Sequence, residues 1–317
     1  MHKQHGIALI TILMLVALAT ILAAGIAKQQ TATADATQSL LHQNQALLYA
    51  KSAEAFFSEI LIDDAKNAGQ VDHLQETWAQ PMPSFPVEGG VVSGRLEDQN
   101  AKFNLNALVQ SDGDTVNPAA QAWFGRMLTR LNLSPELADA VIDWQDQNDE
   151  VSGTMGAESQ YYQSLGQSYV APNQAFNQVE SLKQIRGFEG QNYVLLKPYI
   201  AVYSREQKVN VNTASAWLLT SLDPKLKLSD VENVLTQRRG QLKHWETLTD
   251  FWQTSPFDQV DATIQTQMNS LLGVQSNQFL SVVDIEFSGY TRYMQSQLKR
   301  QGQNIQVQSR ALIPFDQ

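Results

Sequence analysis

The chain has 317 residues, a hydrophobic fraction of 43% and a formal net charge of −10. This length exceeds that of one typical domain, and the acidic balance argues against a surface built for nucleic acid. The sequence contains no cysteine, which excludes disulfide bridges and thiolate metal sites and leaves packing or a hard metal ion to supply stability.

The N-terminus holds a short polar leader and a long uncharged run from Ile7 to Ala27. Such a run is about long enough to cross a bilayer as a helix at roughly 1.5 Å per residue. His2, Lys3 and His5 precede it, so we expect a cytoplasmic N-terminus and a body on the other side of the membrane.

Three interpretations of this segment compete: a cleaved secretory signal, a plain anchor, and a prepilin-type leader cut after Gly6. The apolar segment of a secretory signal is normally about 7 to 15 residues long, which is shorter than this run. Gly6 stands where the polar leader meets the apolar run. This placement favours the prepilin interpretation, with cleavage between Gly6 and Ile7.

The polar segment 28–39 has no strong helix breaker, and an amphipathic pattern follows from Leu40 to about Ala65. We therefore predict one helix of about 60 residues and about 90 Å from the rise per residue. Its second half should bury one face against a domain. The residues of this face are Tyr49, Ala53, Phe56 and Ile60, flanked by Ala46, Ala50, Phe57 and Leu61. The alternative is an anchor, a loose linker and a separate core helix.

Strands are expected on both sides of a long helical stretch. Segment 76–88 holds three prolines and is predicted to be a connector. The period of two in Val91–Asp98 and Ala101–Asn106 predicts two strands around a turn at Asp98–Asn100. Three further strands are predicted near the C-terminus: Phe279–Gly289, Tyr290–Arg300 and Ile305–Phe315. The predicted fold is α+β: a long N-terminal helix on an antiparallel sheet, with a helical insertion.

The insertion contains an internal repeat. Lys102-Phe-Asn-Leu-Asn-Ala matches Lys208-Val-Asn-Val-Asn-Thr-Ala, and each copy continues with an apolar helix, a Leu-Ser helix start and an aromatic-led pattern. This predicts two helix-hairpin modules of the SAM-like kind. We expect helix N-caps at Asn106, Asn212, Ser134 and Ser229, since their side-chain oxygens can accept the free N–H groups of a first turn.

The first copy carries an extra acidic segment after its second helix. Asp146, Asn148 and Glu150 alternate as in calcium loops, and Glu158 and Asn173 can add oxygen ligands. A long loop without secondary structure needs something to organise it, which favours a bound ion over a solvated acidic loop. We therefore predict a calcium site here.

Several features together resemble the type II secretion minor pseudopilin K family. They are Gly6 before a long apolar helix, the N-x-N-T-A motif, and the segment Ala140-Val-Ile-Asp-Trp…Gly156-Ala-Glu158…Tyr162…Pro172-Asn173. The resemblance implies a pilin-like sheet with an inserted α-domain that binds calcium. It also implies cleavage and N-methylation by the prepilin peptidase, and a fibre tip shared with minor pseudopilins I and J. We accordingly expect a single-pass inner-membrane protein with its globular part in the periplasm.

Two positions are informative within this resemblance. Most pilin-like subunits have Glu at mature position five, which is Thr11 here; its absence is typical of family K and fits a subunit with no neighbour ahead of it. Ser159 stands where the family usually has an acid, so it is a candidate ligand and the number of ions is open. Leu41 and Leu48 on the amphipathic half of the helix are the expected partner contacts.

The expected domains are therefore 1–6 leader, 7–27 membrane span, 28–107 rest of the helix and first strands, 108–275 insertion, and 276–317 C-terminal strands. Two rival functions are a membrane-anchored DNA receptor and an enzyme. The hairpin Leu222–Leu226 lacks the glycine pair of helix-hairpin-helix phosphate sites, and its cations are offset by acids. Asp143, Asp146 and Glu158 can form an acid/base pair, but the five histidines are scattered along the sequence. We expect an assembly protein that neither binds nucleic acid nor catalyses a reaction.

Overall fold

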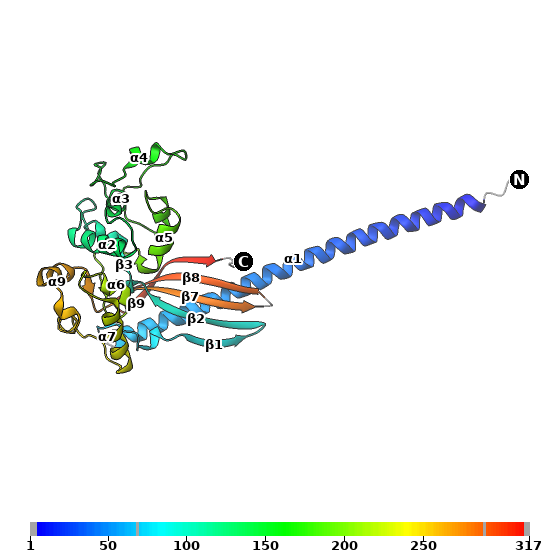
Figure 1. The fold of residues 1–317 in the computed structure, drawn as a ribbon. Helices are drawn as coiled ribbons and strands as arrows, with labels where there is room; N and C mark the ends of the chain where they lie inside the picture. Colours follow the sequence, from blue (N-terminus) through cyan, green and yellow to red (C-terminus); the bar gives the residue numbers. More distant parts are fainter. Residues whose placement is uncertain (1–4, 68–69, 288–289, 314–317) are drawn as a thin grey trace.

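The computed structural model describes residues 5–67, 70–287 and 290–313, so most of the predicted leader lies outside the described residues. Helix α1 (His5–Asn67) is continuous over 63 residues. Its N-terminal half projects from the body, and its C-terminal half lies along a sheet (Figure 1). The prediction of one long helix is confirmed, and the alternative of an anchor, a linker and a separate helix is wrong.

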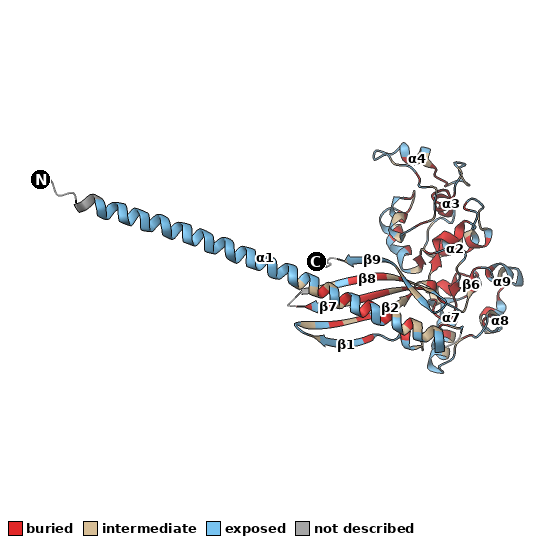
Figure 2. Cartoon of the chain, turned by 180° about the vertical axis from the view of Figure 1, so that it is seen from behind, coloured by how far each residue is buried: buried red, intermediate tan, exposed pale blue. Residues whose placement is uncertain are grey.

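The buried face of α1 is made largely of small residues. Ala46, Ala50, Ala53, Phe57 and Leu61 are buried against the sheet, whereas the free half of the helix is exposed all round (Figure 2). The small alanine side chains allow a close approach of helix and sheet, and Phe57 and Leu61 supply the larger buried side chains of this core. The buried stripe thus consists of the four flanking positions of the predicted face and of Ala53 from its centre. Of the other central positions, Phe56 is 45% exposed and packs edge-to-face on Phe85.

The sheet has five antiparallel strands in the order β1-β2-β7-β8-β9. These are β1 (Met82–Val87), β2 (Gly90–Asp98), β7 (Gln278–Phe287), β8 (Tyr290–Gln301) and β9 (Asn304–Ile313). The predicted α+β fold and the three C-terminal strands are confirmed. The structure places β1 inside the predicted connector, which begins with the short helix η1 (Thr77–Ala79). Pro83 and Pro86 are tolerated because β1 is an edge strand and needs few outward hydrogen bonds.

The predicted hairpin after β2 is wrong. Asp98 accepts a hydrogen bond from the backbone N–H of Asn100 at 2.7 Å, and the helical turn η2 (Gln99–Ala101) directs the chain out of the sheet. The next strand, β3 (Phe103–Asn104), pairs in parallel with β4 (Ile200–Ala201), while β2 pairs with β7. Phe103 belongs to the core of the insertion. Packing therefore divides the chain just after Asp98 rather than at residue 107.

The insertion has its own core and lies at the end of the sheet opposite the free half of α1 (Figure 1). Its first repeat holds β3, η3 (Leu105–Leu108), α2 (Pro118–Arg130), α3 (Leu137–Asp143), α4 (Ser159–Gln163), η4 (Val179–Gln184), α5 (Gln191–Leu196), η5 (Lys197–Tyr199) and β4. The second holds β5 (Val209–Asn210), α6 (Ala216–Thr220), α7 (Leu228–Gly240), α8 (Leu248–Trp252), η6 (Phe257–Gln259), α9 (Ala262–Met268) and β6 (Leu272–Gly273). Each repeat closes on a short parallel strand pair, β3–β4 or β5–β6.

The repeated asparagines clamp distant backbone rather than cap helices. Asn106 Oδ1 accepts from the N–H of Phe176 at 2.7 Å, and its Nδ2 donates to the Phe176 carbonyl at 3.0 Å. Asn212 makes the same two bonds with Trp245, at 2.7 and 3.0 Å. The capping prediction for Asn106 and Asn212 is therefore wrong. A side-chain amide suits this task because it offers a donor and an acceptor side by side.

The predicted caps at Ser134 and Ser229 are also wrong, since each hydroxyl bonds a nearby carboxylate. The cap of α2 is Asn117, and the cap of α6 is Ser215. Asn117 stands before Pro118, and Ser215 directly precedes the helical run of α6. The capping chemistry was thus predicted correctly but assigned to the wrong residues of the repeat.

The insertion is fastened to the sheet at the point where it leaves and returns. Asn100 Oδ1 accepts hydrogen bonds from the backbone N–H groups of Asn277 and Gln278, each at 2.9 Å. The side chain of Asp98 accepts from the hydroxyls of Thr213 and Ser276, both at 2.5 Å. These hydrogen bonds join the two segments that connect the insertion to the sheet, so the insertion is held in one orientation on the sheet.

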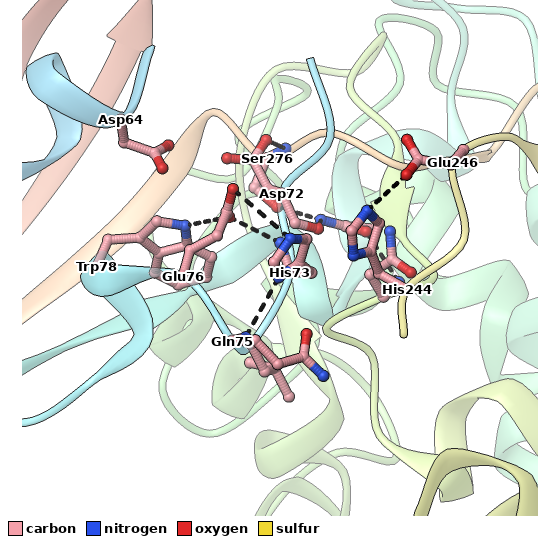
Figure 3. A network of polar contacts seen from close by, with 12 residues as sticks. Asp64, Asp72, His73, Gln75, Glu76, Trp78, His244, Glu246 and Ser276 are labelled. Carbon is pink, nitrogen blue, oxygen red and sulfur yellow. Dashed lines mark hydrogen bonds and ion pairs between the residues drawn. The ribbon is translucent and has the colours of Figure 1, made fainter. Parts of the chain in front are cut away.

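A second contact joins the segment after α1 to both parts of the molecule (Figure 3). Arg300 of β8 pairs with Asp64 at 2.7 Å and with Asp72. The ring of His73 stacks on that of His244 in the second repeat, with centroids 3.9 Å apart. His73 and His244, which are far apart in the sequence, are therefore in contact in the fold.

Candidate metal centre

Three buried carboxylates meet in the first repeat. Asp143 ends α3, Asp146 follows it, and Glu158 immediately precedes α4. One carboxylate oxygen of each lies within 4.8 Å of the others, and all three residues are buried. Asp143 and Asp146 are three apart along a helical turn, which places them on the same side. The extra loop then brings Glu158 back to them.

The oxygens of this cluster have few donors. Asp143 accepts from the backbone N–H of Ser152 at 3.1 and 3.2 Å. By contrast, Asp146 Oδ1 and both carboxylate oxygens of Glu158 are buried, and none of them has a hydrogen-bond donor among the described residues. The loop also passes close to the cluster, since a Cβ at Gly156 would lie 2.5 Å from Asp143 Oδ2. Glycine is therefore required at this position.

Burial and mutual repulsion raise the pKa of both Asp146 and Glu158 to about 7, and burial raises the pKa of Asp143. Arg205 opposes the rise at Asp146, although its guanidinium donates to the carbonyls of Gln110 and Gln145. Three buried acids with so little compensating charge are costly when ionised. A hard cation would supply the missing charge and use the free oxygens.

The predicted ligands occupy different surroundings. Asp146 and Glu158 lie in the cluster, and Asn173 has a buried Oδ1 without a donor while its Nδ2 donates to the Asn148 carbonyl at 3.1 Å. Asn148 Oδ1 accepts from the N–H of Glu150, whose own side chain is exposed. The three-residue spacing from Asp146 is the signal that points to Asp143, which sequence reasoning did not include among the ligands.

Ser159 Oγ accepts a hydrogen bond from the backbone N–H of Ala171 at 3.2 Å. It therefore ties the two ends of the loop segment 159–171 together. Whether Ser159 and the other predicted residues bind calcium stays a prediction.

The predicted residues of α1 are placed as follows. Leu41 and Leu48 are 62% and 63% exposed on the helix surface that faces away from the sheet. Thr11 Oγ1 donates to the Ala8 carbonyl at 2.9 Å. Gly6 and Ile7 lie in the helical backbone of α1, and the side chain of Ile7 is outside the described residues. Among the described residues, α1 is the helix long and apolar enough to cross a membrane.

The hairpin proposed for a DNA receptor, Leu222–Leu226, is bonded at both ends by two arginines of the first repeat, while Pro224 and Lys225 at its tip are exposed. Arg126 donates to the carbonyl of Ser221 at 3.0 Å, and Arg130 donates to those of Thr220 and Leu226 at 2.9 and 3.0 Å. The backbone N–H groups of Lys225 and Leu226 are also occupied, since they donate to Asp223 Oδ1 at 2.8 Å and to the Asp223 carbonyl at 3.1 Å. A phosphate site needs free N–H groups at such a turn, so this arrangement argues against the DNA receptor.

Comparison with known proteins finds family models of the type II secretion system (T2SS) protein K over residues 101–205 and 209–275. These two matches coincide with the two repeats of the insertion. Type II secretion system protein K of Pseudomonas aeruginosa is 34% identical over 248 residues, which cover 74% of this chain and 72% of that protein. The Klebsiella pneumoniae protein K is 30% identical over 321 residues, 98% of this chain and 96% of the relative.

The fold agrees with these matches. The crystal structure of the GspK-GspI-GspJ complex from the enterotoxigenic Escherichia coli type 2 secretion system contains a similar chain. The TM-score is 0.79 at 27% identity, and the match covers 88% of this chain and 99% of that chain. Sequence identity over most of the length and a shared fold lead to the same conclusion: the chain belongs to the type II secretion system protein K family.

Proposed function

We propose that this chain is the minor pseudopilin at the tip of the type II secretion pseudopilus, where it initiates or caps the fibre together with I-type and J-type subunits. The observation that carries the proposal is the position of the insertion, which lies at the end of the sheet opposite the free half of α1 (Figure 1). A subunit stacked above would need the space that the insertion fills. The chain can therefore end a helical fibre but cannot be repeated along it.

The N-terminus fits the assembly of such a fibre. Prepilin peptidase would cleave between Gly6 and Ile7 and methylate the new N-terminus. The exposed apolar half of α1 would rest in the inner membrane, with the body in the periplasm, until it enters the fibre core. Thr11 supplies no carboxylate to the terminal amine of a neighbouring subunit. This agrees with a subunit that has no neighbour ahead of it in the fibre. Intact-mass measurement of the chain from membranes should show loss of six residues and gain of one methyl group.

The exposed side of α1 is the proposed contact with the I-type and J-type subunits. Leu41 and Leu48 lie seven residues apart, on the same side of the helix. Exposed Phe56 and its edge-to-face partner Phe85, with centroids 6.3 Å apart, extend the apolar surface to the edge strand β1. The complex formed by the similar chain with GspI and GspJ supports this choice of partners.

We also propose that calcium occupies the carboxylate cluster. Asp143, Asp146 and Glu158 would hold it, with the Asn173 amide oxygen as a further ligand. The donor-free buried oxygens of Asp146, Glu158 and Asn173 support this assignment. The ion would neutralise the cluster and fix the extra loop, so its role is structural rather than catalytic.

The capping role can be tested by removing the insertion cleanly. Asp98 and Phe279 are paired across β2 and β7, so an Asn-Gly turn in place of residues 99–278 closes a two-residue hairpin. We expect this variant to remain in the membrane but to fail in initiating or capping fibres. Fibres of normal number and length in cells that carry it would refute the proposal.

A further inference from the structure

Leu242 is an exposed leucine in an unfavourable backbone conformation. It follows α7, its φ is 54° and it is 75% exposed. A left-handed φ is disfavoured for residues with a Cβ. Because its side chain is exposed, Leu242 also contributes little of the stability that burial of a leucine would give. Strain of this kind is commonly kept at functional positions.

The loop around Leu242 is well built. The N–H of Lys243 donates to the Arg238 carbonyl at 2.9 Å, and the N–H of Leu242 donates to the Arg239 carbonyl at 3.1 Å. These two bonds form the Schellman motif, whose left-handed position usually holds glycine. The loop is thus a regular helix end with a leucine where glycine would be easier.

Two further contacts fix the loop. The Arg238 guanidinium donates to the His244 carbonyl at 2.5 Å and lies 4.5 Å from the centre of the Trp245 ring. The His244 ring stacks on His73 from the segment after α1 (Figure 3). Leu242 is therefore presented by a backbone that is anchored to both parts of the molecule.

The charges that neighbour Leu242 in the chain are positive. Arg239 and Lys243 are exposed, and neither forms an ion pair within the described chain. The nearby Glu246 is paired with His244 at 2.9 Å. In a chain with a net charge of −10, residues 236–245 contain four basic or histidine side chains and no acid. This surface thus has an exposed leucine that lies along the chain between two exposed cations, neither of which has an ion-pair partner among the described residues.

We propose that Leu242, Arg239 and Lys243 form a docking point for an acidic protein surface, in which Leu242 enters an apolar socket rimmed by carboxylates. This inference rests on the proposed function, because the insertion that carries the loop then lies at the end of the fibre. A single leucine offers too little apolar area to hold a membrane, and two cations are few for nucleic acid. A fixed apolar anchor flanked by charges suits a protein partner.

The first experiment measures both Tm and secretion, so that an effect on docking can be told from an effect on folding. The full chain is expressed in cells that secrete through this system. Leu242→Gly removes the side chain and suits the positive φ, so we expect an equal or higher Tm but reduced secretion. Asn132→Gly is the matched control, since Asn132 holds the same motif position after α2 with a φ of 59°. It should leave secretion unchanged. Wild-type secretion by Leu242→Gly would overturn the inference.

A double charge reversal, Arg239→Glu with Lys243→Glu, keeps the test valid if Leu242→Gly lowers the Tm. Both side chains are exposed and have no ion pair within the described chain, so the fold should persist with a small fall in Tm from acids at the C-terminal end of α7, while secretion falls. Normal secretion by this variant would also count against the docking point. Cells that lack the chain altogether test the proposed function, which fails if they secrete normally. Cross-linking tests the docking point independently of secretion.

For that purpose a photoreactive amino acid is placed at position 242 of the full chain in cells. We expect an adduct with a protein, and we expect the charge reversal to reduce its yield by about tenfold or more if the pair contributes as interface charges do. An adduct with phospholipid alone, or a protein adduct that the charge reversal leaves unchanged, would contradict an acidic protein partner.

Discussion

The two repeats of the insertion share a frame and differ in what they add to it. Each begins with a short strand, clamps the backbone of an aromatic residue through an asparagine, and closes with a parallel strand pair. The first repeat adds a long loop with three buried carboxylates. The second has a short connection that carries the exposed Leu242. The shared residues thus hold the fold, and the differing segments carry the proposed site and surface.

The largest effect should come from breaking the shared frame. Asn106→Ala and Asn212→Ala each leave a buried N–H and carbonyl without their partner, at about 1–3 kcal/mol for each group. We expect similar losses of roughly 3 kcal/mol or more in either repeat, measured by denaturant unfolding of the full chain in detergent. Asn233→Ala, at an exposed position of α7, is the control. A large loss in one repeat with almost none in the other would show that the clamps are not equivalent.

Calcium should act on the first repeat. At a free concentration of 100 times its Kd, an ion that binds only the native state adds about 2.7 kcal/mol of stability. Glu158→Gln should remove most of this gain, whereas Glu150→Gln, at an exposed position, should retain it. An equal Tm in calcium and in chelator would rule out the site.

The pH dependence should follow the same cluster. Because the pKa values of Asp146 and Glu158 are raised to about 7, the native state binds more protons than the unfolded state between about pH 4 and 7. Without calcium, stability should therefore fall as pH rises through this range, by about 1 kcal/mol per carboxylate after allowance for screening. Asp146→Asn should flatten the curve. Calcium competes with these protons, so the stabilisation by calcium should increase with pH. Calorimetry at several pH values measures it, and a stabilisation that is the same at every pH would contradict this prediction.

The smallest effect is expected at Ser159. Its hydroxyl accepts the Ala171 N–H, so Ser159→Ala should cost about 1 kcal/mol and shift calcium affinity little. A loss of calcium binding as large as that of Glu158→Gln would instead make Ser159 a ligand. Isothermal titration of the two variants compares them directly.

Local patterns in the sequence predicted the long helix, the C-terminal strands, the repeat and two members of the acidic cluster. What they could not predict depends on contacts between distant residues. Asn106 has the composition of a cap, and only the approach of Phe176 makes it a clamp. The prolines of β1 indicate a connector unless the strand is known to be at an edge. The three-residue spacing pairs Asp143 with Asp146, but the arrival of Glu158 beside them depends on the path of the loop, which spacing does not show.

The central claim is that the insertion lets the chain occupy only the end of a fibre. A gold label attached to an exposed insertion residue such as Val194, followed by electron microscopy of pseudopili assembled in cells, tests this claim most directly. We predict label at one end of each fibre. Label repeated along the fibre length would contradict the account.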